Sequence, residues 1–81
     1  MKTKAEKWGM ALDAIPRQDD GTRDYNVWTR TLRDAIAAAR RITEECPDSY
    51  DSSITLTFDD GSQIYVGNPA QAAFAGFVVY E

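Results

Sequence analysis

Carboxylates are the most concentrated reactive groups in this chain, and they gather in its second half. Residues 44–81 hold seven acidic residues and no Lys or Arg, whereas residues 1–43 hold all nine basic residues and six acids. The first half therefore carries a formal charge of +3 and the second half −7. An uncompensated acidic surface repels phosphates and attracts basic protein surfaces. A surface that served solubility alone would mix acidic and basic residues, so we predict that this acidic surface binds a partner. Its members are Glu44, Glu45, Asp48, Tyr50, Asp51, Asp59 and Asp60.

A second candidate surface is basic and consists of Arg30, Arg33, Arg40 and Arg41. These arginines would lie on the polar face of a predicted helix, where basic groups can hold phosphates. Asp34, Glu44 and Glu45 lie about one helical turn away and can pair with them. No aromatic residues alternate with them as a stacking platform for bases would require. Because the whole chain carries a net charge of −4, direct nucleic-acid binding is the weaker hypothesis.

Residues that could carry out catalysis are few. The chain has no His, which excludes imidazole acid–base catalysis, a Ser-His-Asp or Cys-His arrangement and His ligation of a metal. Cys46 follows two glutamates and has no activating base nearby in the sequence. The Asp-Asp-Gly steps at residues 19–21 and 59–61 lack the further ligands of a calcium loop and are typical of turns. We expect no enzymatic activity, no cofactor and no metal site.

The predicted helix runs from Val27 to Cys46. Its start lies between Asp24 and Val27, because Asp24 and Asn26 are both suitable N-caps, and its end precedes Pro47. At about 100° per residue one apolar stripe forms, in which Cys46 would close the last turn as a small apolar residue. The stripe contains Trp28, Leu32, Ala35, Ile36, Ala39, Ile42 and Cys46.

A β-hairpin is predicted over residues 54–66, with its turn at Asp59-Asp60-Gly61. A two-residue loop would put Ile64 and Val66 on the same face as the threonines. A three-residue loop, with Gly61 in the left-handed position of a bulge, pairs Leu56 with Ile64 and Ile54 with Val66. Only this register gives one apolar face. It directs Ile54, Leu56, Phe58, Ile64 and Val66 to the core and Thr55, Thr57, Gln63 and Tyr65 away from it.

The remaining elements complete an α+β layer. Residues 7–15 fit either an alternating strand or a short helix, and we favour the strand; residues 17–24 form a polar loop. Asn68-Pro69 is the order typical of a helix start, with Gly76 as the C-terminal cap of a short second helix. Residues 77–80 form a strand beside the hairpin. The predicted fold is one long amphipathic helix packed on a small antiparallel sheet of three or four strands, with that short second helix.

Length and composition indicate one domain over residues 1–81, with a modest stability margin and no disulfide, since the chain has one cysteine. Nothing resembles a signal peptide or a membrane span, so we expect a cytoplasmic protein that does not enter a membrane. Self-association could supply the stability that a small core lacks. We therefore also consider a structural or assembly role, in which a homodimer forms through a sheet edge such as residues 77–80.

The strand and turn Thr57-Phe58-Asp59-Asp60-Gly61-Ser62, together with the small size, acidity, lack of His and expected fold, resembles the phage-encoded anti-CRISPR proteins. At least one acidic member of that group carries a similar strand-turn. The group has no shared motif from which functional residues can be carried over. The resemblance implies an inhibitor that binds a CRISPR effector complex in a bacterial cytosol and blocks its basic nucleic-acid channel. The nine basic residues depart from the most acidic DNA mimics, so an acidic surface patch is expected rather than mimicry by the whole surface.

Overall fold

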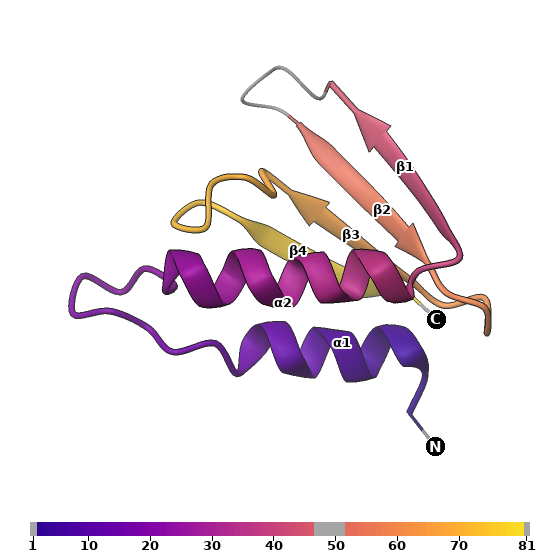
Figure 1. Ribbon diagram of the computed structural model, residues 1–81, viewed down its shortest axis with the longest axis horizontal. Coiled ribbons are helices and arrows are strands. Elements are labelled where there is room, and N and C mark those ends of the chain that lie inside the picture. The colour runs from indigo at the N-terminus through magenta and orange to yellow at the C-terminus, as the bar shows by residue number, and fades with distance from the viewer. Residues whose placement is uncertain (1, 47–51, 81) are drawn as a thin grey trace.

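A computed structural model describes residues 2–46 and 52–80. Two helices lie on one face of a four-stranded antiparallel sheet in which neighbours in sequence are neighbours in space (Figure 1). This arrangement confirms the α+β class and the antiparallel sheet. The elements are α1 (Lys4–Asp13), α2 (Tyr25–Ala38), β1 (Arg41–Glu45), β2 (Ser53–Thr57), β3 (Gln63–Gly67) and β4 (Gly76–Tyr80).

The hairpin of β2 and β3 has the predicted register. Leu56 pairs with Ile64 and Ile54 pairs with Val66. The turn places Gly61 at a φ of 86°, a conformation that glycine adopts without a steric penalty. All five side chains predicted to face the core are less than one-tenth exposed. The predicted strand after Gly76 is also confirmed, since β4 pairs antiparallel with β3.

Helix α2 begins as predicted but ends earlier. Asp24 is the N-cap, and its side chain accepts a hydrogen bond of 3.1 Å from the backbone N–H of Val27. The prediction that the helix continues to Cys46 is wrong, because the backbone becomes extended at Ala39 and residues 41–45 form β1. Strand pairing there satisfies backbone groups of β2 that would otherwise lie at a sheet edge. Cys46 follows this strand, is exposed and has a φ of 49°, so it closes no helical turn.

The first element is helix α1, so the preference for a strand over residues 7–15 is wrong. Thr3 and Glu6 form a capping box in which Thr3 Oγ1 accepts from the N–H of Glu6 and Glu6 accepts from the N–H of Thr3. The helix packs on β4 through Gly9, where a Cβ would lie 2.7 Å from Val79 Cγ2. A side chain at this position would therefore force Val79 or the helix itself to shift.

The predicted short helix after Asn68-Pro69 does not form. Asn68 has a φ of 53°, whereas an N-cap residue is extended, and residues 68–74 make successive turns closed by bonds from Gln71 N–H to Asn68 O and from Phe74 N–H to Gln71 O. Gly76 is the first residue of β4 and not a helix cap. Besides α2, the helix found in the described residues is α1, near the N-terminus.

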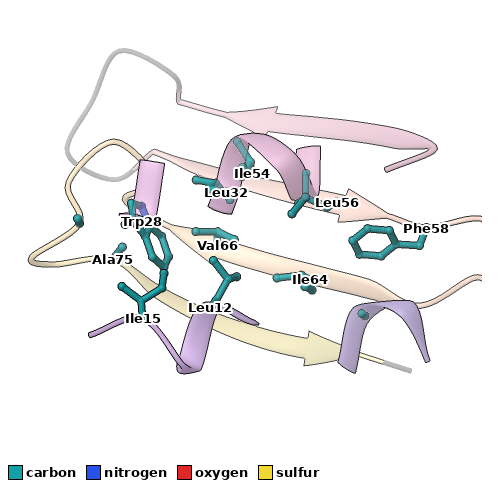
Figure 2. Packing of buried hydrophobic residues seen from close by; sticks show 13 residues of the cluster. Leu12, Ile15, Trp28, Leu32, Ile54, Leu56, Phe58, Ile64, Val66 and Ala75 are labelled. Carbon is teal, nitrogen blue, oxygen red and sulfur yellow. The ribbon is translucent and has the colours of Figure 1, made fainter. Parts of the chain in front are cut away.

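The core lies between the helices and the central strands. Figure 2 shows Trp28 and Leu32 of α2 and Leu12 of α1 pointing onto the apolar face of β2 and β3, with Phe58 at the hairpin end. Trp28 is fully buried, and its indole N–H donates to the carbonyl of Pro69 at 2.8 Å. These contacts fix residues 68–75 against α2 and leave β1 outside the core.

Candidate functional site

Strand β1 is the least covered element of the sheet. All five of its residues are exposed, whereas every residue of β2 is buried or half-buried. Ile42 is 42% exposed although its cross-strand neighbour Leu56 is fully buried. Figure 1 shows β1 at the outer edge of the sheet, clear of both helices. Backbone pairing with β2, and not burial, therefore holds this strand in place.

The alternation of an antiparallel ladder shows which backbone groups of β1 are free. The N–H of Phe58 donates to the carbonyl of Ser62, so even-numbered residues of β2 bond to β3 and odd-numbered residues bond to β1. The partners of those odd-numbered residues are Arg41, Thr43 and Glu45. Ile42 and Glu44 consequently direct their N–H and C=O groups away from the sheet, at its outer edge.

The predicted acidic surface is divided by the fold. Glu44 and Glu45 lie at the end of β1 that is paired with Ser53, whereas Asp59 and Asp60 follow the opposite end of β2. Asp48, Tyr50 and Asp51 lie outside the described residues. Within the described residues, Glu44 and Glu45 are exposed and have no ion pair or side-chain hydrogen bond.

Asp59 and Asp60 hold the start of α1. One oxygen of Asp60 accepts from the backbone N–H of Lys4 at 2.8 Å, and the other accepts from the N–H and the hydroxyl of Ser62. Ser62 Oγ in turn accepts from the N–H of Ala5 at 3.0 Å. Asp59 forms an ion pair of 2.5 Å with Lys4 Nζ. The bond from Lys4, followed by those from Ser62, lowers the pKa of Asp60 to about 2. These two carboxylates therefore cap and anchor a helix.

The predicted basic face is also divided. Arg30 and Arg33 are exposed on α2, while Arg40 follows the helix and Arg41 begins β1. The four side chains cannot share one helix face because the helix ends at Ala38. Arg41 and Glu45 instead lie on the sheet face that points away from the helices, because their neighbours Ile42 and Glu44 pair with the buried residues Leu56 and Ile54.

Sequence reasoning missed Arg23, which is the arginine most closely integrated into the fold. Its guanidinium lies 5.0 Å from the ring centroid of Trp28 and donates to the carbonyls of Ala75, at 2.5 Å, and Ala72. Burial lowers the pKa of Arg23, and the charge of Arg17 lowers it further. No local pattern marks this role, since the carbonyls come from residues about 50 positions later in the chain. Arg23 ties the turns before β4 to α2.

The sheet face opposite the helices carries a small apolar patch on β3 and β4. Tyr65 and Val78 are cross-strand neighbours, 39% and 49% exposed, and Tyr80 beside them is 52% exposed. Tyr65 was predicted to point away from the core, and it does. Exposed aromatic side chains of this kind are common in surfaces that contact macromolecules.

The surface has shallow hollows that are open to solvent and could contact another molecule. One of about 300 Å³ lies between residues 18–25 and 71–74 and includes Phe74, which is 75% exposed. A smaller one of about 160 Å³ lies beside Glu44, Ile54 and Pro69, at the acidic end of β1. In the described part of the chain, no group of three or more Asp, Glu or Cys side chains is arranged to hold a metal ion. Neither described helix is long and apolar enough to cross a membrane.

Comparison with known proteins found no match to a family model, to a curated protein or to a solved structure.

Proposed function

We propose that this protein is a non-enzymatic inhibitor that acts by binding another protein, and that it does so through β1 with Glu44 and Glu45. The observation that carries this proposal is an edge strand whose five residues are all exposed and whose outward backbone groups have no partner among the described residues. Two carboxylates on this strand have no ion partner among the described residues. An edge of this kind can accept a strand from another chain and select it by charge.

The two glutamates would act on different faces of such a complex. Glu44 shares the helix-side face with Ile42, whereas Glu45 shares the open face with Arg41 and Thr43. A basic partner segment paired with β1 would place Lys or Arg beside a carboxylate on each face, with Ile42 as an apolar contact next to Glu44 on the helix side. Asp48, Tyr50 and Asp51 follow in the sequence and complete the proposed contact set.

The resemblance to anti-CRISPR proteins indicates which partner to test first. A CRISPR effector complex has a basic channel for nucleic acid, and an acidic edge bound there would compete with the phosphates. The protein would then work in the cytosol of a bacterial host. Asp59 and Asp60 support α1 in the structure, so in this proposal they contribute to folding and leave the contact to the β1 end.

A pull-down with purified CRISPR effector complexes tests this function. We expect the wild-type protein to retain an effector at low salt and to release it as salt is raised. Replacing Glu44 and Glu45 with Lys should abolish capture. The matched control replaces Asp19 and Asp34, both exposed and away from β1, with Lys, which changes the net charge equally and should leave capture intact. Capture that survives the Glu44 and Glu45 replacements, or fails equally in the control, would refute the role of this edge.

A further inference from the structure

We propose that a second copy of this chain pairs with β1, strand against strand and antiparallel, about a two-fold axis through Thr43. This proposal concerns the same edge but does not need the effector partner, because it depends only on groups that the strand itself carries. The result would be a continuous sheet of eight strands with the helices of both copies on one side. Symmetric pairing of two identical strands is the simplest closed association that an open edge allows.

The order of charges along β1 is self-complementary. Its sequence is Arg-Ile-Thr-Glu-Glu, with a basic group at one end and acidic groups at the other. Antiparallel pairing about Thr43 sets Arg41 opposite Glu45 of the second copy, and the two-fold axis repeats this pair. Both residues lie on the open face and are exposed, so their side chains can meet.

The free backbone groups match the same register. Ile42 would lie opposite Glu44 of the second copy, and these are the two residues whose N–H and C=O groups face outward. Each such pair exchanges two hydrogen bonds, and the symmetry gives two pairs. A register centred on Ile42 would require the N–H of Arg40, which already donates to Thr57 O at 2.8 Å. The Thr43 register therefore uses the whole strand and leaves the internal ladder unchanged.

Side-chain burial favours association at this edge as well. Ile42 is 42% exposed on the helix side and would contact Ile42 of the second copy diagonally across the pair. In the dimer β1 gains an outer neighbour and becomes an interior strand. Charged residues on an edge often prevent association, but that protection requires like charges to meet. Here antiparallel pairing brings opposite charges together at Arg41 and Glu45, whereas Glu44 lies opposite Ile42 of the second copy.

Charge reversal in a symmetric dimer gives a sharp test. Sedimentation equilibrium should show a reversible dimer of the wild-type protein. In R41E and in E45R each interface holds two like-charge pairs, so we expect the dimer Kd to rise by about tenfold or more. An equal mixture of R41E and E45R should associate more tightly than either variant alone, because two carboxylates of one variant then face two guanidinium groups of the other at both ends of the paired strands. The double variant R41E/E45R should also recover self-association, since the two charges of each pair are exchanged.

Controls separate this interface from others. R30E changes an exposed arginine of α2 and should leave the dimer Kd unchanged. Circular dichroism establishes that each variant is folded, which is expected because both positions are exposed. A monomer at every concentration up to about 1 mM would overturn the proposal. A dimer insensitive to both single reversals would also overturn it and would favour the edge at residues 77–80. R41E/E45R restores the charge pairs of the dimer but leaves a basic residue at position 45. It should therefore recover self-association without recovering capture of a basic effector, so the two losses are distinguishable.

Discussion

Gly9 provides the most direct test of how α1 packs on the sheet. A Cβ at this position would lie 2.7 Å from Val79 Cγ2 and 3.6 Å from Phe77 Cε2. In a helix with open space, Gly to Ala would increase stability by about 1 kcal/mol. Here the added methyl must displace Val79 or move α1 away from β4, and such overpacking costs about 1 to 3 kcal/mol. We therefore expect G9A to be destabilising by about 1 kcal/mol on balance, which lowers Tm by roughly 5 °C in a domain of this size.

Thermal and urea unfolding of G9A, G76A, V79A and G9A/V79A measure this effect. G76A is the matched control, because no atom lies within 4 Å of a Cβ built on Gly76. Shortening Val79 removes the clashing methyl, so G9A should cost less in the V79A background than in the wild type, with a coupling of about 0.5 kcal/mol or more. A rise in the Tm of G9A, or strict additivity with V79A, would refute the packing of α1 on β4.

Two further predictions concern the groups that fix the helices. The lowered pKa of Asp60 means that its ionised form stabilises the fold above the ordinary carboxyl pKa of 3.8, and that this contribution is lost as pH falls through about 2. D60N should therefore lower the Tm at pH 7, and the difference from the wild type should shrink between pH 4 and pH 2; a constant difference would contradict the role of the carboxylate. R23K should destabilise by on the order of 1 kcal/mol and alter Trp28 fluorescence, since Lys cannot both cover the ring and donate to two carbonyls. R33K, at an exposed arginine of α2, is its control, and an equal effect there would count against this role.

Local sequence patterns were sufficient for the hairpin and for the buried part of α2. In the hairpin, alternation and one glycine at a positive φ allow a single register with one apolar face, so residues 54–66 could be predicted in detail. Trp28, Leu32 and Ala35 repeat at helical spacing beside a strong cap, and all three are buried. In both cases the deciding information lies within about 15 residues of sequence.

Elements that depend on distant partners could not be predicted in the same way. Residues 39–46 fit a helical stripe, but pairing with β2 makes residues 41–45 a strand. Alternation alone could not settle the first element; the capping box of Thr3 and Glu6 is a sequence signal that would have favoured the helix. The contact of Gly9 with β4 involves residues about 70 positions away, which no local pattern contains.

The acidic residues show why closeness in sequence is a poor guide to a surface. Glu44, Glu45, Asp59 and Asp60 lie within 17 residues of sequence, yet β2 carries the chain from one end of the sheet to the other between them. The second pair then meets Lys4 at the N-terminus of α1, a residue that precedes the element predicted over residues 7–15. The proposed contact surface is therefore limited to the edge that carries Glu44 and Glu45.

Amide hydrogen exchange along β1 tests the central claim, that this edge is a site of association. In the single chain, the N–H groups of Thr43 and Glu45 bond to β2 and should exchange slowly, whereas those of Ile42 and Glu44 face solvent and should exchange fast. We predict that raising the protein concentration slows exchange at Ile42 and Glu44 in the wild type and has a much weaker effect in R41E. Fast exchange at both residues at every concentration, and in the presence of an effector complex, would contradict the account.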